Sequence, residues 1–537
     1  MTAPGQPTAP PAPAGGGRHA FLVGAGILLS RIAGLVRQRV FAHYFGQSDA
    51  GDAFNAAFKI PNFLQNLFGE GVLSASFIPV YSSLLARGEE EEARRVAGVV
   101  GSLLALVTSA LVLAGVVVTP ALVDAIAPGF EGAKRDLAID LVRILFPGTG
   151  LLVLSAWCLG ILNSHRRFFV SYTAPVLWSV AMIAAMLVFG ARRDEGGLAV
   201  VLAWASIAGA VLQLGVQVPL VLRLAGGLRP SLDLGSAGAR TVVRNFGPVF
   251  VGRGVVQISS FVDSILASFL PSGAVTALAN AQTLYTLPVS LFGMAVSASE
   301  LPAMSSVVGA KDEIAATLRV RLDAGLRRIA FFIVPSAIGF LALGDVIAAA
   351  LFQTGRFSHD DAVWVWGILA GSSIGLLVGT LGRLYASTYY ALHDTRTPLR
   401  YATLRVALAT SLGYLLAIQV PPVLGIDPKW GVVGLTLSGG LAGWIEFALL
   451  RRTLHRRIGA VAMPVSYLAS LWGAAVAAAA LGGSVKLTAG AGLSPIVLAV
   501  VVLGPYGVCY FAITWMLGVA ESRTLIARVT ARISRRR

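Results

Sequence analysis

The sequence predicts an all-α integral membrane protein with about 14 transmembrane helices, arranged as two parallel six-helix repeats followed by two C-terminal helices. Three observations lead to this prediction: the composition, a series of long apolar runs, and an internal repeat. Hydrophobic residues make up 56% of the chain and charged residues only 13%, with a mean hydropathy of +0.77. A soluble domain of this composition would lack the polar side chains to cover its surface, whereas a bilayer requires none.

About fourteen apolar runs are long enough to cross a hydrocarbon layer that is about 30 Å thick. They follow an uncharged Pro- and Gly-rich segment, residues 1–17, which lacks the basic region of a cleaved signal and predicts a disordered tail. The second and eighth runs are long enough to include a loop or an amphipathic turn. In order, the runs span 21–44, 51–86, 96–122, 138–162, 168–190, 197–224, 242–270, 274–308, 326–353, 362–389, 398–420, 431–450, 463–482 and 491–519.

Basic residues between the runs predict the orientation. If the N-terminus is cytoplasmic, the inner loops carry about 20 Lys and Arg side chains and the outer loops about 7. Because Lys and Arg are enriched in cytoplasmic loops, both termini are expected to be cytoplasmic. We therefore assign the net charge of +16 to topology and to contacts with anionic lipid headgroups, not to nucleic acid.

An internal repeat divides the chain into two halves. LFGEGVLSASFIPVYSS at 67–83 and LFGMAVSASELPAMSS at 291–306 align with one deletion, each in the second span of its half. A helix-packing seam of small residues could also produce such runs, but the register extends over roughly a dozen positions. Parallel repeats are typical of alternating-access transporters, whose site lies between the halves. The predicted organisation is a cytoplasmic tail (1–17), two six-helix bundles (18–224 and 225–455), two further helices (456–520) and a basic cytoplasmic tail (521–537).

Charged residues within the first two runs indicate the functional site. Arg31, Arg37 and Arg39 lie in the first run, and Lys59 and Glu70 in the second. Because such charges are costly in hydrocarbon, we expect them to line a wet cavity walled by protein. The planar guanidinium group of arginine presents N–H donors in a geometry that matches the oxygen atoms of a pyrophosphate. This cavity is therefore predicted to receive an anionic group. Two alternatives stay open: Arg37 and Arg39 snorkel to the interface, or Glu70 pairs with Lys59.

Later spans add two arginines and a candidate cation site. Arg253 and Arg383 interrupt the seventh and tenth spans beside small residues, and we expect them to line the cavity as well. Asp263, Asp394 and Thr410 carry oxygen atoms that could hold a small cation. Pairing of either aspartate with an arginine is an equal alternative.

Motifs for ATP hydrolysis or metal catalysis are missing from the sequence. It contains no GxxxxGK[ST] phosphate loop, no HExxH and no CxxC pair. Cys158 and Cys509 lie far apart in apolar runs, and the histidines fall in the tail, in loops or at span ends. We therefore expect a transporter and not an enzyme, with no cofactor and with sodium or a proton as a coupling cation.

Eleven short stretches add a family resemblance. They are SRIAGLVR (30–37), DAFNAAFKIPN (52–62), EGVLSASFIPV (70–80), APGF (127–130), GILN (160–163), LAWASIAGAVLQLGVQVP (202–219), GP (247–248), QIS (257–259), ASFL (267–270), LFQTGRF (351–357) and YYALHDTRTP (389–398). In this order they resemble the MurJ (MviN) family of lipid II flippases, within the multidrug/oligosaccharidyl-lipid/polysaccharide exporter superfamily. The resemblance extends over about residues 21–520.

The resemblance implies a fourteen-helix protein of the bacterial inner membrane that takes part in cell-wall biogenesis. It would move lipid II, an undecaprenyl-pyrophosphate-linked peptidoglycan precursor, from the inner to the outer leaflet, working as a monomer among membrane lipids. Helices 13 and 14 are similar to a pair that forms a groove for the lipid tail. Asp263, Asp394 and Thr410 fall near positions that bind sodium in some members, with Tyr390 where another polar ligand is expected. By position, the resemblance matches Ser30, Arg31 and Arg37 to the family's first-helix motif and Asp52, Lys59, Pro61, Asn62 and Glu70 to its second-helix signature. All of these except Pro61 are expected to contact the substrate.

Two departures from the family pattern concern the headgroup contacts. Gln65 stands where members often carry arginine, so we count it among the substrate-binding positions. Gln282, Thr283 and Thr286 stand where members carry an acid, an arginine and an acid. We expect Arg253 to supply the missing charge.

Other functions remain open on the sequence. A flippase for another polyprenyl-linked glycan, or a drug exporter of the same superfamily, would share the fold and the repeat. A membrane-embedded glycan ligase would need a catalytic acid or base on a large outer loop, and the outer loops expected here are short. A structural scaffold would not need arginines within its spans.

Overall fold

The computed structural model describes residues 16–306, 310–461, 463–489, 492–525 and 527. These residues form helices and contain no strand, apart from an isolated bridge between Thr354 and Phe357. They divide into two compact units. Unit 1 comprises Met1–Phe41, Ala56–Val123 and Arg135–Ile258, and unit 2 comprises Ala42–Asn55, Asp124–Lys134 and Ser259–Arg537.

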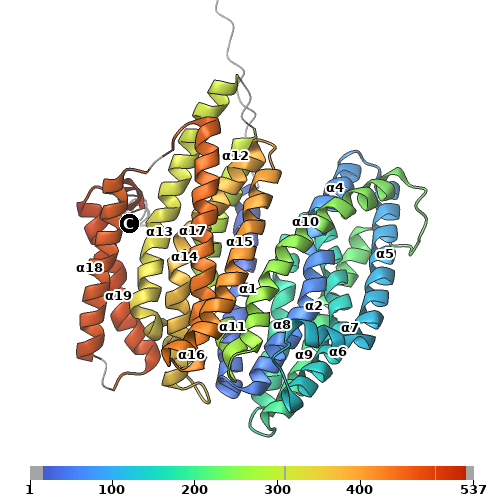
Figure 1. Ribbon diagram of the computed structural model, residues 1–537. Coiled ribbons are helices and arrows are strands. Elements are labelled where there is room, and N and C mark those ends of the chain that lie inside the picture. The colour runs from blue at the N-terminus through green and yellow to red at the C-terminus, as the bar shows by residue number, and fades with distance from the viewer. Residues whose placement is uncertain (1–15, 307–309, 462, 490–491, 526, 528–537) are drawn as a thin grey trace, which may run out of the picture. The chain divides into compact units, whose positions relative to one another are not determined.

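The helices follow one another along the chain with short connections (Figure 1). The first ten are α1 (Gly16–Phe45), α2 (Asp49–Phe68), α3 (Glu70–Ser76), α4 (Ile78–Ala86), α5 (Glu90–Val117), α6 (Thr119–Ile126), α7 (Gly132–Ser164), α8 (Phe168–Phe189), α9 (Glu195–Leu224) and α10 (Ala237–Ser268). The rest are α11 (Ala274–Pro288), η1 (Val289–Met294), α12 (Ala295–Ser305), α13 (Lys311–Phe352), α14 (His359–Ala391), α15 (Arg396–Tyr414), η2 (Leu415–Gln419), α16 (Val420–Leu424), η3 (Pro428–Trp430), α17 (Gly431–Ile458), α18 (Val465–Ala489) and α19 (Pro495–Met516).

The prediction of an all-helical chain with many membrane spans is confirmed. Eleven helices within the described ranges are long and apolar enough to cross a membrane. The predicted runs 21–44, 51–86 and 242–270 are helical too, and they contain the charged residues from which the site was predicted. The second run breaks into α2, α3 and α4, as its length suggested. The third run contains one candidate span, α5, which ends at Val117, and the end of the run falls in α6, which begins at Thr119 next to Pro120.

Both copies of the sequence repeat depart from regular helix at the same tripeptide. Leu67-Phe68-Gly69 ends α2, whereas Leu291-Phe292-Gly293 lies in η1, a π-helical turn. Each glycine is in close contact: an added Cβ would lie 2.2 Å from the Gln65 carbonyl oxygen at Gly69, and 2.3 Å from Thr380 Cγ2 at Gly293. Since π turns are frequent at functional sites, the π turn at 289–294 marks a point of special helix geometry in the second copy, and the first copy has a helix break at the same tripeptide.

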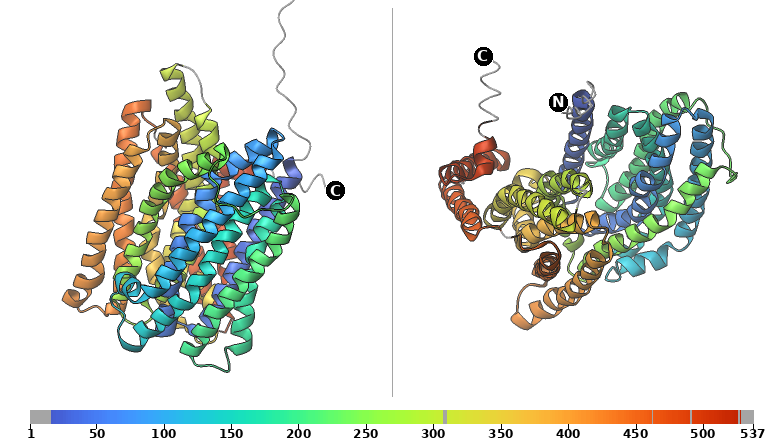
Figure 2. Two further views of the ribbon diagram at one scale, coloured as in Figure 1. Left: turned by 90° about the vertical axis from the view of Figure 1, so that its right-hand side faces the viewer. Right: turned by 90° about the horizontal axis from the view of Figure 1, so that it is seen from above.

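Helices α18 and α19 pack on α13 within unit 2, as two views show (Figures 1 and 2). Leu343 and Val346 of α13 are buried against Ala499 and Val502 of α19. The Tyr510 hydroxyl donates to the Phe331 carbonyl oxygen at 2.6 Å. An ion pair between Lys486 of α18 and the buried Asp345 of α13 adds a polar attachment.

Gly375→Ala is expected to destabilise the packing of α14 against α17. A Cβ at Gly375 would lie 2.6 Å from the Cα of Gly440, so the two backbones would have to separate. Overpacking of this kind costs about 1–3 kcal/mol. Thermal unfolding of the purified protein in detergent would show a lower midpoint for this variant.

Gly382→Ala provides the matched control on the same helix. A Cβ at Gly382 would meet nothing within 4 Å, so this variant should melt within about 0.5 kcal/mol of the parent. Equal effects of the two changes would contradict the close approach as the cause.

Candidate functional site

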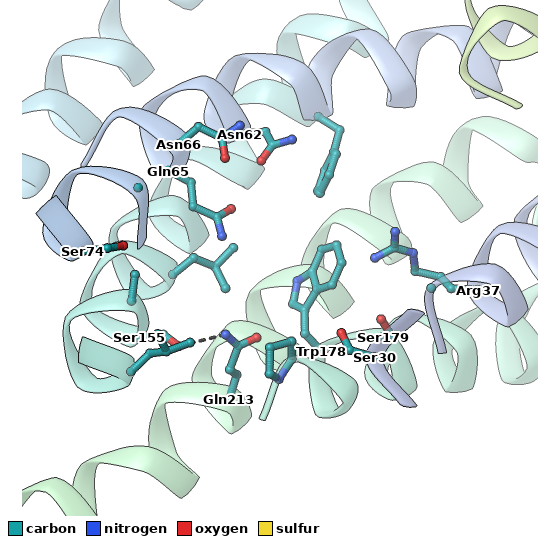
Figure 3. A pocket seen from close by; sticks show the side chains of 17 residues that line it. Ser30, Arg37, Asn62, Gln65, Asn66, Ser74, Ser155, Trp178, Ser179 and Gln213 are labelled. Carbon is teal, nitrogen blue, oxygen red and sulfur yellow. Dashed lines mark hydrogen bonds between the residues drawn. The ribbon is translucent and has the colours of Figure 1, made fainter. Parts of the chain in front are cut away.

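A cavity of about 650 Å³ lies inside unit 1 (Figure 3). Helices α1, α2, α3, α7, α8 and α9 contribute to its wall. Most of its polar groups are uncharged amides and hydroxyls, and Arg37 is the only charged side chain among the described residues that line it. The lining residues are Ser30, Gly34, Arg37, Phe58, Asn62, Gln65, Asn66, Gly71, Ser74, Leu152, Ser155, Ala156, Leu159, Pro175, Trp178, Ser179 and Gln213.

Helical spacing places the polar groups of α1 on one face. Ser30, Gly34 and Arg37 are four and three residues apart, so they follow the same stripe of the helix. Nothing lies within 4 Å of a Cβ added at Gly34, so the space between Ser30 and Arg37 is open. Arg31 is displaced from this stripe by about 100°, and it is exposed and does not line the cavity.

Helix α2 presents a second polar stripe. Three amide side chains of this helix line the cavity, those of Asn62, Gln65 and Asn66. Phe58, four residues before Asn62, lines it as well. The side chains of Asn62, Gln65 and Asn66 make no hydrogen bond to the residues that the structure describes, and none of them is buried. Their donors and acceptors are therefore available to water or to a ligand.

Trp178 holds Arg37 in place. The guanidinium carbon of Arg37 lies 4.4 Å from the centre of the Trp178 ring, a cation–π geometry. Phe58 stacks on Trp178 with centroids 5.6 Å apart, and the indole N–H donates to Ser206 Oγ at 3.1 Å. The indole plane is thus fixed from two directions, and it positions the charge of Arg37 at the cavity.

A buried hydrogen-bond chain supports the opposite side. Gln213 Nε2 donates to Ser155 Oγ at 2.8 Å, and Ser155 Oγ donates to Gln217 Oε1 at 2.6 Å. These residues, with Trp178 and Asn66, were missed in the prediction of the site. The signal was present in LAWASIAGAVLQLGVQVP, where two glutamines interrupt an apolar span.

The structure brings four of the predicted residues to one cavity: Ser30, Arg37, Asn62 and Gln65. Lys59 also lies on α2, three residues before Asn62, and it does not line the cavity. The side chains of Glu70 and Arg253 fall outside the described residues, so the replacement of lost charge by Arg253 stays a prediction. Arg383 lies in α14 of unit 2, where it is exposed.

Asp52 was predicted to contact substrate, but the structure gives it a different set of partners. Only 1% of it is exposed, and its carboxylate accepts hydrogen bonds from Lys134 Nζ at 2.7 Å and from the backbone N–H groups of Gly273 and Thr276 at 2.8 Å. These N–H groups belong to the N-terminus of α11, which an anion stabilises. Asp52 therefore caps α11 and ties three segments of unit 2 together.

The prediction of a single cation site that contains both Asp394 and Thr410 is wrong. Thr410 lies 14 residues after Arg396, the first residue of α15, or about 20 Å along the axis from Asp394, which precedes that helix. Asp394 instead accepts a hydrogen bond from Arg457 at 2.6 Å, which is the pairing with arginine that the sequence left open. Asp263 lies on α10. Within the described ranges, no group of three His, Cys, Asp or Glu residues could hold a metal ion.

Asp394→Asn is expected to lower stability at neutral pH but not at strongly acid pH. Hydrogen bonds from Thr397 and contact with Arg457 lower the pKa of Asp394 from 3.8 to about 2. Because the folded state holds this proton more weakly than the unfolded state, the carboxylate stabilises the fold above about pH 4 and loses this effect as the pH falls through 2. Melting temperatures of parent and variant should converge between pH 5 and pH 2. A constant difference across that range would contradict the role of the carboxylate.

The pentapeptide GSSIG at 371–375 has the spacing of a hydrolase nucleophile elbow but not its geometry. It lies within the continuous helix α14, and the Ser373 hydroxyl donates to the Ala370 carbonyl oxygen at 2.7 Å. A nucleophile elbow is a sharp strand-to-helix turn, so this serine is not exposed in that way.

Eleven described helices long and apolar enough to span a membrane, with a polar cavity inside one helical unit, indicate a polytopic membrane protein, and this combination is typical of transporters. Comparisons with known proteins give the family. The model of the family described as lipid II flippase MurJ matches residues 41–516, and the chain therefore belongs to the MurJ family.

Curated relatives agree with this assignment. The chain is 32% identical over 437 residues to the lipid II flippase MurJ of Burkholderia cenocepacia, an alignment that covers 80% of this chain and 82% of the relative. It is 31% identical over 444 residues to the probable lipid II flippase MurJ of Haemophilus influenzae, covering 80% and 84%.

Solved structures share the fold. A lipid II flippase MurJ in an inward closed conformation aligns with a TM-score of 0.74 at 22% identity, covering 93% of this chain and 99% of that one. An inward-facing multidrug resistance MATE transporter of the MOP superfamily aligns with a TM-score of 0.63 at 15% identity, covering 82% and 100%.

Proposed function

We propose that this chain is a lipid II flippase, which carries a polyprenyl-diphosphate-linked peptidoglycan precursor from the inner to the outer leaflet of the bacterial cytoplasmic membrane. The observation that carries the proposal is the cavity of unit 1, in a chain of the MurJ family, which is lined by one arginine and by a set of amides and hydroxyls. Such a lining suits a headgroup that contains both phosphate and sugar.

The physical problem of flipping explains why a cavity is required. A diphosphate and a sugar cannot cross hydrocarbon unaided, because burying their charges and hydroxyls without partners is prohibitive. Arg37 supplies a fixed positive charge, and Asn62, Gln65 and Asn66 supply donors and acceptors for hydroxyls. The headgroup would therefore exchange its hydration for these groups while the polyprenyl tail stays in lipid.

An apolar groove in unit 2 suits that tail. A hollow of about 370 Å³ is lined by residues of α11, η1, α13 and α19, among them Phe292, Phe332, Tyr506 and Phe511. Phe292 and Phe332 stack with centroids 4.3 Å apart. We infer that α18 and α19 correspond to the two additional helices that the sequence predicted, and that the tail lies against them.

The remaining parts of the mechanism rest on the sequence. We infer two six-helix halves that alternate access to the headgroup site, both termini in the cytoplasm, a monomer, and no enzymatic step. The membrane potential, worth about 2.3 kcal/mol per charge per 100 mV, or a gradient of sodium or protons would reset the carrier.

Complementation tests the proposal. Cells depleted of their own lipid II flippase should grow when they express this chain, and the precursor should become accessible at the outer leaflet. Membrane-inserted protein that restores neither growth nor accessibility would contradict the assignment. A change in drug resistance without an effect on viability would instead favour drug export.

A further inference from the structure

Two arginines and one glutamate lie within three packed helices of unit 2. Arg383 is on α14, Arg405 on α15 and Glu446 on α17, and α17 packs against both other helices. The three residues lie 8, 9 and 12 positions from Ala391, Arg396 and Ile458, which end or begin their helices. At 1.5 Å per residue, all three are about 12–18 Å from those helix ends, well inside the spans.

The cluster carries an excess of positive charge. Arg405 Nε lies 3.0 Å from Glu446 Oε2, so these two charges balance. Arg383 acts electrostatically on Glu446 and on the phenol of Tyr285, but it forms no ion pair with any residue that the structure describes. Two arginines and one glutamate leave a net charge of +1. A charge within a membrane span is costly, so it indicates a functional anion site.

Space beside the cluster is open. A Cβ added at Gly382, next to Arg383, would meet nothing within 4 Å, and the same holds at Gly439, two turns before Glu446 on α17. The Arg405 side chain is 41% exposed and the Glu446 side chain 21%. An anion could therefore reach both guanidinium groups.

We infer that Arg383 and Arg405 form an anion-binding subsite for a lipid phosphate, and that Glu446 holds Arg405 when the subsite is empty. Planar guanidinium forks pair with phosphate oxygens through two parallel hydrogen bonds. The subsite rests on the proposed function only for the identity of its anion, the diphosphate of the carried lipid.

Binding to the purified full-length protein in uncharged detergent tests the subsite with two probes in separate arms, undecaprenyl diphosphate and phosphatidylglycerol. Arg383→Gln breaks no described ion pair, and it should weaken binding of the diphosphate lipid about 10- to 100-fold, the effect of losing one charge-assisted contact. Glu446→Gln should act in the opposite direction, because the cluster changes from +1 to +2, and binding should tighten several-fold. Misfolding cannot produce opposite signs.

Arg400→Gln is the matched control, an exposed arginine near the start of α15, and it should leave affinity unchanged. If Arg383→Gln weakens the binding of undecaprenyl diphosphate, the subsite is supported as part of transport. If Arg383→Gln weakens only the binding of phosphatidylglycerol, a phosphate site that is filled by bulk lipid is supported. Unchanged affinity of Arg383→Gln in both arms overturns the subsite. If the parent protein itself fails to bind undecaprenyl diphosphate, the proposed function fails, and the phosphatidylglycerol arm still decides the subsite.

Discussion

Arg37→Ala is expected to abolish complementation of cells that lack their own lipid II flippase. Arg37 is the only charged side chain among the described residues lining the cavity, and it lies 4.4 Å from the Trp178 ring. Its removal leaves the cavity of unit 1 with amides and hydroxyls alone, which cannot offset the charge of a diphosphate inside that cavity. Loss of one or two charge-assisted hydrogen bonds at about 1.5–3 kcal/mol each predicts a fall in transport of at least tenfold. Growth and outer-leaflet accessibility of the precursor measure the effect.

Two further variants show whether charge or geometry is responsible. Arg37→Lys keeps the charge but loses the planar fork, so it should restore growth only in part. Trp178→Leu keeps Arg37 but removes the aromatic face that holds it, and it should reduce transport less than Arg37→Ala does. Arg192→Ala, in the exposed connection between α8 and α9, serves as the control and should grow like the parent. Normal growth of Arg37→Ala at normal expression would contradict the role of the cavity.

Asp52→Ala is expected to destabilise unit 2 by about 3–5 kcal/mol, the cost of breaking a buried ion pair from one side. The carboxylate accepts hydrogen bonds from Lys134, Gly273 and Thr276, all at 2.7–2.8 Å, and is almost fully buried. Its loss leaves the half-buried ammonium of Lys134 with one partner fewer and removes the acceptor of two N–H groups at the N-terminus of α11. Unfolding of the purified protein by heat or denaturant measures the change.

Asp49 provides the matched control, because it binds the same ammonium at 2.8 Å but its side chain is 60% exposed. Exposed ion pairs contribute about 0–1 kcal/mol, so Asp49→Ala should have a small effect. Combining Asp52→Asn with Lys134→Gln removes both charges, and the double variant should be more stable than the sum of the two single changes predicts. Similar losses for Asp49→Ala and Asp52→Ala would contradict the network as described.

The contrast between Arg37 and Asp52 shows how far a sequence can predict a site. Both are charged residues in the first two runs, and the sequence assigned both to substrate. Arg37 does line the cavity. Asp52 instead accepts hydrogen bonds from groups of the same protein that lie 82 to 224 positions away in the chain. A charge in an apolar run indicates that the charged group needs a partner. The sequence does not show whether this partner is a ligand or another segment of the same protein.

The same limit applies to the other polar residues. Asp394 and Thr410 were grouped by residue type and family resemblance, yet the length of α15 separates them. Arg405 and Glu446 were not singled out at all, because each appears in the sequence as an isolated charge within a long apolar run. Trp178 and Gln213 resemble ordinary lipid-facing or core residues until the packing of α1, α2, α7, α8 and α9 places them around one cavity.

The sequence by itself determined the membrane fold, the positions of the helical runs and the family. The cost of placing polar groups in hydrocarbon accumulates over about 20 consecutive residues, so this information is local and can be read along the chain. Only the tertiary structure decided which charges are neutralised within the protein and which remain for a ligand. The reason is that electrostatic and hydrogen-bond partners are selected by distances of 3–4 Å between helices, which hydropathy along one helix does not encode.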